Sequence, residues 1–122
     1  MNDRDIYREE ILEHYRHPQN FGSIHKPTHT GAAENPLCGD SIVVEWRVKG
    51  NKVNGVGFTG AGCALSTASA SLFTEWLRGK TLKQLQHVQP SQLFRLIEVP
   101  ITPVRHQCVL LPFTALRKVF EV

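Results

Sequence analysis

Apolar and polar residues alternate with a period of two from Ser41 to Lys49, which is the clearest strand pattern in the chain. The apolar positions of this segment are Ile42, Val44, Trp46 and Val48. Such alternation is typical of a strand with one buried face. The Gly50-Asn51 pair that follows favours a tight turn, so we expect Lys52 to Thr59 to return as the antiparallel partner in a hairpin.

A third strand is expected from Gly31 to Glu34, where small residues permit close packing. Its pattern is weaker than that of the hairpin. Gly55 and Gly57 lie inside the second hairpin strand and indicate a bulge or the close approach of another segment. Three consecutive antiparallel strands are the simplest sheet that these segments form.

Several other segments carry helical signals, either apolar residues at helical spacing or residues typical of a helix start. The expected helices are Asp3 to Tyr15, Ala64 to Arg78, a short helix that starts at Thr81-Leu82-Lys83-Gln84, Ser91 to Leu96, and Val109 to Val122. The first helix must end before Pro18, and Gly79 stands where helices commonly end. Thr81 and Gln84 have the form of a capping box.

Prolines constrain the C-terminal third of the chain. Two of them predict an extended segment from Val99 to Val104. Pro112 is compatible with the last helix only in its first turn. That restriction places Cys108 at or just before the start of the helix.

The first half of the helix from Ala64 is unusually rich in small and hydroxyl-bearing side chains. These residues are Ser66, Thr67, Ala68, Ser69, Ala70 and Ser71. A helix surface of this kind lets another backbone, or a partner, come close.

Together these patterns predict an α+β fold in which a three-stranded antiparallel sheet is packed by several helices. The chain has 122 residues and is expected to form one domain over residues 1–122. Hydrophobic residues make up 41% and charged residues 20%, which is ordinary for a soluble globular protein. No apolar run approaches the roughly 18 residues of a membrane span, and the charged N-terminus is unlike a secretory signal. We therefore expect a cytoplasmic protein.

The net charge of +3 comes from basic residues scattered along the chain. No block of about five or six like charges occurs, so we expect a solvated surface with at most one basic docking patch. No sequence motif for nucleic-acid binding is present. We expect neither a nucleic acid nor a membrane as a partner.

The chain has three cysteines, Cys38, Cys63 and Cys108. Their odd number argues against a disulfide framework. They are not arranged as the close pairs of zinc-finger ligands, so only the fold can bring them together. Cys38 lies two residues before Asp40 in the turn-forming stretch Asn35 to Asp40, which places a thiol beside a carboxylate.

Cys63 and Cys108 are both expected at the starts of helices, where the helix dipole and unpaired amides stabilise a thiolate. Three thiolates and the carboxylate of Asp40 make four ligands, which suits tetrahedral Zn²⁺ or a small iron–sulfur cluster. The alternative is that the cysteines are small buried apolar residues. His106 is a further candidate ligand or proton donor, and equally a solvated loop residue.

These motifs resemble those of the iron–sulfur cluster assembly scaffolds of the IscU/SufU family, which share their module with the N-terminal domain of NifU. The matching stretches are Tyr7 to Gly22, Asn35 to Asp40 (N-P-L-C-G-D), Gly60 to Lys80 (beginning G-A-G-C-A-L-S) and Arg105 to Leu116. They cover most of the chain, and the match is weakest from Thr81 to Val104. The resemblance implies a fold of SufE/NifU type, a three-stranded antiparallel sheet with helices packed against it.

By this resemblance Cys38, Cys63 and Cys108 are the thiolate ligands of a cluster or of zinc, and Asp40 is the fourth ligand. Members of the family accept sulfur as persulfide from a pyridoxal-phosphate cysteine desulfurase. They assemble a transient [2Fe–2S] cluster and pass it to apo-proteins. An iron donor and a chaperone are further candidate partners.

The sequence also departs from both branches of the family. Gln107 stands where the IscU branch has a histidine, and Ile101 to Arg105 replaces its chaperone motif L-P-P-V-K. Arg105 and Cys108 instead match the R-x-x-C of the SufU branch. However, only 45 residues separate Cys63 from Cys108, which leaves little room for the extra SufU segment.

Two functions are therefore open at this point. The first is a non-enzymatic scaffold for a transient cluster. The second is a zinc-dependent sulfurtransferase of SufU type, which stimulates its desulfurase and in which Cys38 accepts the persulfide sulfur. A purely structural zinc domain is a third reading, but the glycines around Cys63 favour an accessible site over a closed one.

Overall fold

The computed structural model describes residues 9–36, 39–98 and 100–120. Its sheet has three antiparallel strands in the order β1-β2-β3. The strands are β1 (His29–Asn35), β2 (Asp40–Lys49) and β3 (Lys52–Ala61). The predicted α+β fold with a three-stranded antiparallel sheet is confirmed. The first strand is longer than its small residues predicted, because every residue of β1 has a partner on β2.

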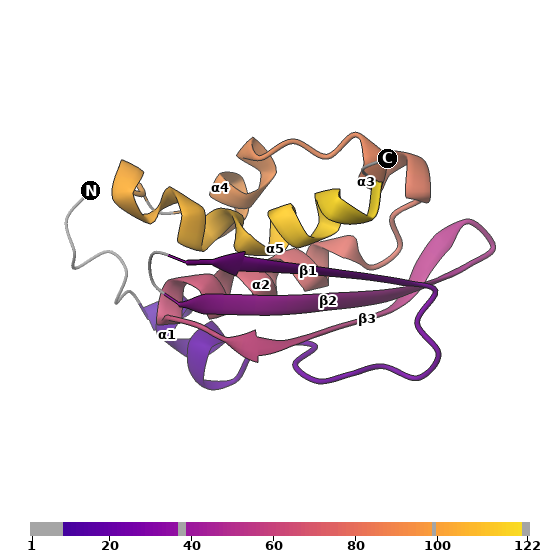
Figure 1. Ribbon diagram of the computed structural model, residues 1–122, viewed down its shortest axis with the longest axis horizontal. Coiled ribbons are helices and arrows are strands. Elements are labelled where there is room, and N and C mark those ends of the chain that lie inside the picture. The colour runs from indigo at the N-terminus through magenta and orange to yellow at the C-terminus, as the bar shows by residue number, and fades with distance from the viewer. Residues whose placement is uncertain (1–8, 37–38, 99, 121–122) are drawn as a thin grey trace.

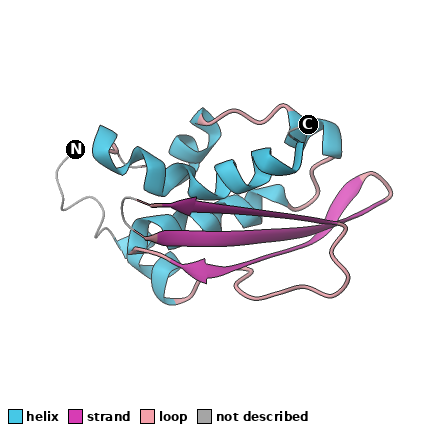
Figure 2. Cartoon of the chain, viewed as in Figure 1, coloured by secondary structure: helices cyan, strands magenta, loops and turns pink. Residues whose placement is uncertain are grey.

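The helices lie on one side of the sheet, with α5 and α2 directly against it (Figures 1 and 2). They are α1 (Glu9–Arg16), α2 (Ala64–Leu77), α3 (Leu82–Gln86), α4 (Ser91–Ile97) and α5 (His106–Phe120). The start predicted for the first helix lies outside the described residues. The capping box of α3 is present, because Thr81 and Gln84 exchange side-chain-to-backbone hydrogen bonds.

The last helix begins three residues earlier than predicted, at His106. A 3₁₀ turn over Pro103–Arg105 runs directly into it, so only part of the segment predicted as extended is extended. Pro112 therefore lies inside α5 and not in its first turn, which corrects the prediction. Its ring is fully buried, and that packing offsets the loss of one helical amide.

The core lies between the inner face of the sheet and the helices α2 and α5. Its large, fully buried side chains include Val44, Trp46, Leu65, Phe73, Leu77, Val109 and Leu116. The alternation predicted for β2 is observed, with Ile42, Val44 and Trp46 facing inward. Among the helices of the described residues, none is long and apolar enough to cross a membrane.

Close backbone approach explains the strand glycines. A Cβ on Gly57 would collide with the carbonyl oxygen of Gly22, and one on Gly31 with the carbonyl oxygen of Ala115 in α5. Gly31 thus lets α5 lie directly on β1. The register between β2 and β3 also shifts at Arg47, opposite Gly55, as the bulge expected there requires.

The hydroxyl-rich face of α2 receives two other segments, as the sequence predicted. The Ser69 hydroxyl donates to the carbonyl of Val109 in α5 at 2.6 Å. The Ser71 oxygen accepts the backbone amide of Gln19 at 2.8 Å and lies 2.7 Å from Nδ1 of His14 in α1. Short side chains let these neighbours approach, and their hydroxyls satisfy the backbone groups buried by the contact.

Candidate metal centre

Asp40 is the first residue of β2 and lies on its core-facing side. Side chains alternate across a strand, so Asp40 shares a face with Ile42 and Val44. Gly39 precedes it with a φ of +74°, and its amide donates to the carbonyl of Asn35 at 2.9 Å. This turn places the Asp40 carboxylate at the end of the core. Only 4% of the residue's surface is exposed.

Cys63 is the N-cap residue of α2, as the sequence predicted for a cysteine just before this helix. Its backbone is extended, with φ −72° and ψ 170°, and its Sγ accepts the amide of Ser66 at 3.5 Å. An N-cap position satisfies an otherwise unpaired helix amide, here with sulfur in place of the usual oxygen. The thiol is therefore held at the positive end of a 14-residue helix.

Strand pairing brings Asp40 and Cys63 together although 23 residues separate them. Ser41 at the start of β2 pairs with Ala61 at the end of β3, so the residues flanking the open end of the hairpin are neighbours. The amide of Cys63 donates to Oδ1 of Asp40 at 3.2 Å. The carboxylate thus fixes the backbone that carries the thiol.

Cys108 lies within the first turn of α5, two residues past its start, where the sequence predicted a position at or before the start. It is buried, with 6% of its surface exposed. The bond from Ser69 to the next residue, Val109, anchors this turn of α5 to the N-terminal half of α2. Neither Cys63 nor Cys108 is in a disulfide.

The ligand atoms of Asp40, Cys63 and Cys108 all lie within 4.8 Å of one another. Ligand atoms around a tetrahedral zinc ion with bonds of ~2.0–2.3 Å are about 3.5–3.8 Å apart. Contraction by about 1 Å would therefore bring the three described groups onto one ion. The fourth predicted ligand, Cys38, lies outside the described residues.

His106, the additional candidate, is not a member of this group among the described residues. Its Nε2 lies 3.1 Å from the carbonyl oxygen of Ile101, and its ring packs edge-on against Phe94. His106 is therefore half-buried at the start of α5 and is not a solvated loop residue.

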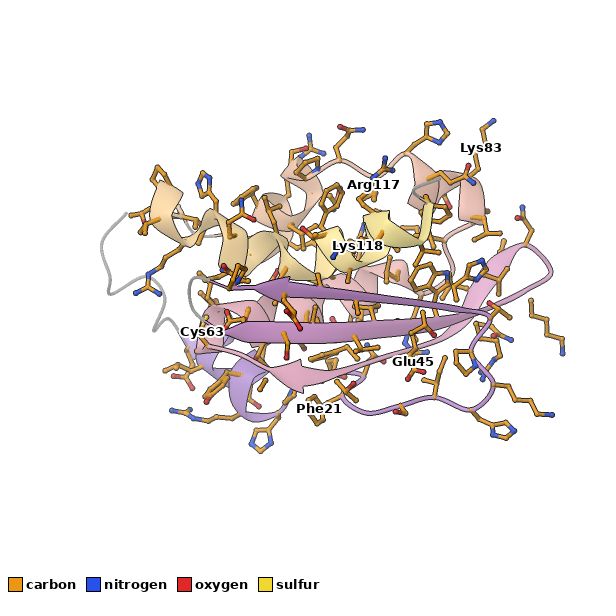
Figure 3. The ribbon with its side chains drawn as sticks, viewed as in Figure 1. Phe21, Glu45, Cys63, Lys83, Arg117 and Lys118 are labelled. Carbon is orange, nitrogen blue, oxygen red and sulfur yellow. The ribbon has the colours of Figure 1, made fainter. Side chains whose placement is uncertain are left out.

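The centre is open on one side. Gly60, Ala61 and Gly62, which lead into Cys63, are exposed, and Cys63 is half-buried. An open depression of about 470 Å³ adjoins this segment and is lined also by Tyr15 and Phe21. Figure 3 shows Cys63 at one end of the sheet and Lys83 at the opposite end. Among the described residues, the segment that leads into Cys63 is thus exposed at this end of the sheet.

Sequence reasoning named Ser66 and the glycines around Cys63 but missed how Ser66 and Gly62 shape the centre. Ser66 bonds to both the sulfur and the carbonyl of Cys63, and Gly62 leaves the space that the Ser66 hydroxyl fills. The signal for Ser66 was its position three residues after an N-cap. This spacing is the usual one for an N-cap contact, but it was interpreted only as part of a small-residue face.

Fold and site together define a small α+β protein in which Asp40, Cys63 and Cys108 form a group that could hold a metal ion at one end of an antiparallel sheet. The family model described as the NifU-like N terminal domain matches residues 6–120. The chain belongs to this family.

Similar proteins include the Haemophilus influenzae protein named iron-sulfur cluster assembly scaffold protein IscU. It is 34% identical over 115 residues, which cover 91% of this chain and 90% of that protein. A Drosophila melanogaster protein named iron-sulfur cluster assembly enzyme IscU is 32% identical over 116 residues, covering 92% of this chain and 74% of its own.

Among solved structures, a scaffold protein for the SUF system from Fervidobacterium islandicum, described there as putative, has the same fold. The TM-score is 0.82 at 24% identity, over 98% of this chain and 100% of that chain. A NifU-like N-terminal domain from Brucella abortus gives a TM-score of 0.76 at 22% identity, over 97% and 94% of the two chains. At this level of identity the comparison concerns the fold alone.

Proposed function

We propose that this chain is an iron–sulfur cluster assembly scaffold. It receives sulfur from a pyridoxal-phosphate-dependent cysteine desulfurase and holds a transient [2Fe–2S] cluster through Cys38, Asp40, Cys63 and Cys108. The cluster is cargo, built on the protein and passed on to apo-proteins.

The observation that carries this proposal is the convergence of Asp40, Cys63 and Cys108 in a chain of the NifU-like family. Iron–sulfur clusters are held by thiolates, and a carboxylate is a harder ligand than the thiolate it replaces. A site with one such ligand suits a cluster that must be released. The exposed segment from Gly60 to Gly62 gives donors and acceptors access to it.

Sulfur delivery needs a nucleophile, and Cys38 has this role by resemblance to the family. Its thiolate attacks the outer sulfur of the desulfurase persulfide. The S–S bond breaks, the desulfurase cysteine leaves as a thiolate, and Cys38 carries the new persulfide. Reduction of that sulfur to sulfide takes two electrons, which come from an external thiol or an electron-transfer protein.

Anaerobic reconstitution tests the proposal. The protein is incubated with ferrous iron, cysteine, a desulfurase and a thiol reductant, and its visible spectrum is recorded after desalting. We expect cluster absorption bands in the parent and their loss in Cys63→Ser. A parent protein that acquires no bands would overturn the scaffold function.

A zinc-dependent sulfurtransferase is the second candidate, in which the same four residues hold Zn²⁺. The exposed Gln107 before Cys108, where the IscU branch has histidine, favours it. Desulfurase turnover is measured with and without the zinc-loaded protein. Stimulation that disappears in Cys38→Ala would support this function, and no stimulation would count against it. Metal analysis of protein purified without oxygen decides which cargo is loaded.

A further inference from the structure

Ser66 is buried in direct contact with the half-exposed ligand Cys63, and only 3% of its surface is exposed. Its backbone amide donates to the Cys63 sulfur at 3.5 Å. Its hydroxyl oxygen accepts the Cys63 S–H at 3.7 Å and donates its own proton to the Cys63 carbonyl at 3.1 Å. One residue therefore contacts both the sulfur and the backbone of a proposed ligand.

These contacts depend on whether the sulfur carries a proton. In the thiol, the S–H donates and the hydroxyl proton of Ser66 points to the carbonyl. In a thiolate or a metal-bound sulfur that proton is gone, so rotation about the Cβ–Oγ bond turns the hydroxyl proton toward the sulfur. Two donors, the amide and the hydroxyl, then stabilise the negative sulfur without any movement of the backbone.

We propose that Ser66 is a positioning residue for the metal centre, which holds the Cys63 side chain toward Asp40 and Cys108 and donates a hydrogen bond to its metal-bound sulfur. The inference rests on the proposed function of the centre and adds a role for a residue that binds no metal. Groups of this kind fix the orientation of a ligand, and their loss typically weakens metal binding by about 10- to 100-fold.

Gly62 belongs to the same arrangement. A Cβ on Gly62 would collide with the Ser66 hydroxyl oxygen, while the next nearest atoms, Cγ and Oδ1 of Asp40, lie at ordinary distances of 3.4 and 3.5 Å. The space that a side chain at position 62 would need is thus the space that the hydroxyl occupies. This overlap makes the two positions energetically coupled.

Ser71 offers a matched control. It lies on the same helix, is fully buried, and its hydroxyl oxygen accepts the backbone amide of Gln19. Ser66→Ala and Ser71→Ala therefore remove the same group from similarly buried positions. Of these two serines, only Ser66 is hydrogen-bonded to the sulfur of a proposed ligand.

Cobalt(II) is the probe, because its visible spectrum reports thiolate ligation. Affinity is measured by competition with a chelator, and thermal melting of the apo-protein is recorded for each variant. We expect Ser66→Ala to bind Co²⁺ about tenfold more weakly than the parent. We also expect its sulfur-to-cobalt charge-transfer band to shift to longer wavelength, because a sulfur that loses a hydrogen bond gives up an electron more easily. Ser71→Ala should change neither the Co²⁺ affinity nor the charge-transfer band.

Gly62→Ala is a second variant that keeps the test decisive if Ser66→Ala folds poorly. Where Ser66→Ala folds, the two changes also form a double-mutant cycle. Gly62→Ala displaces the hydroxyl while leaving the serine in place, so it should weaken Co²⁺ binding about as much as Ser66→Ala. In the Ser66→Ala background the same change should cost far less, because the collision is gone. Additive effects would overturn the inference, as would equal losses of Co²⁺ affinity in Ser66→Ala and Ser71→Ala, or an unchanged charge-transfer band.

The outcome is separable from that of the proposed function. If the parent assembles a cluster and the Ser66 variants match it in Co²⁺ affinity and spectrum, the positioning role is wrong and the scaffold function stands. If the parent binds neither a cluster nor Co²⁺, both are wrong.

Discussion

The amide of Cys63 donates a hydrogen bond to Oδ1 of Asp40 at 3.2 Å, so the proposed carboxylate ligand also anchors the backbone of a proposed thiolate ligand. Asp40 is buried at the start of β2, and Cys63 caps α2. One carboxylate therefore joins the end of the sheet to the start of a helix. This double role can be tested by separating its two parts.

Asp40→Ala is expected to lengthen the lifetime of a bound cluster, although it leaves the four-ligand set incomplete. The reason is that the carboxylate is the hardest ligand of the set and keeps the site labile. The lifetime is measured as the decay of visible absorption after a chelator is added. A variant that loses its cluster faster than the parent would refute this role.

Asp40→Asn keeps an oxygen that can accept the Cys63 amide, whereas Asp40→Ala does not. The unfolding free energy should therefore fall by about 1 kcal/mol more in Asp40→Ala than in Asp40→Asn.

Gly31→Ala is expected to destabilise the protein by about 1–3 kcal/mol, as overpacking does. A Cβ at position 31 would collide with the backbone carbonyl of Ala115, so β1 and α5 would have to move apart to make room for it. Urea unfolding monitored by circular dichroism gives the free energy. Gly55→Ala is the control, because its Cβ would meet the guanidinium of Arg47, the end of a flexible side chain. Equal losses in the two variants would contradict the packing argument.

Ser71→Ala is expected to lower the unfolding free energy by about 1–3 kcal/mol, because it removes the acceptor of a part-buried amide, that of Gln19. The same change breaks the contact with His14 in α1, so α1 should become easier to digest with protease. Thr67→Ala, on the same helix and half-buried, is the control and should stay within about 0.5 kcal/mol of the parent. A loss in the control as large as that in Ser71→Ala would argue against this contact.

Metal removal should leave the fold intact. The buried core between the sheet and helices α2 and α5 is extensive, and of the two described cysteines only Cys108 belongs to its fully buried part. Treatment of the zinc-loaded protein with EDTA is expected to preserve the helical circular dichroism and a cooperative thermal transition, at a lower melting temperature. Outright unfolding would instead indicate a structural zinc domain.

Local signals predicted much of the fold. The alternation over β2, the Gly50-Asn51 turn and the Thr81 capping box each depend on neighbouring residues, and each is observed. The predicted start of α5 was wrong because Pro112 is usual only in the first turn of a helix and so suggested a helix that begins shortly before it. The burial of its ring, which makes a proline tolerable there, is a property of the assembled core.

For the candidate site, too, local sequence signals predicted some features and the assembled fold determined the others. Residue type and local position placed Cys63 at the start of a helix and Asp40 beside Cys38. The convergence of Asp40 and Cys63 with Cys108 depends on the hairpin register and on the packing of α2 against α5, which no short stretch encodes. The helix start at Ala64 was predicted correctly, but the contact of Ser66 with the Cys63 sulfur depends on where the two side chains lie, and the pattern of small residues does not show that.

The β2–β3 hairpin has a consequence for how this protein can vary in length. Asp40 and Cys63 flank its open end, while the Gly50-Asn51 turn lies at the opposite end of both strands. Residues added in matched pairs beside the turn would lengthen both strands and leave the Ser41–Ala61 pairing untouched. The number of residues between Asp40 and Cys63 is therefore set by the length of the two strands. The chemistry of the two side chains does not fix it. The turn is accordingly the place to insert a tag or a reporter peptide without disturbing the centre.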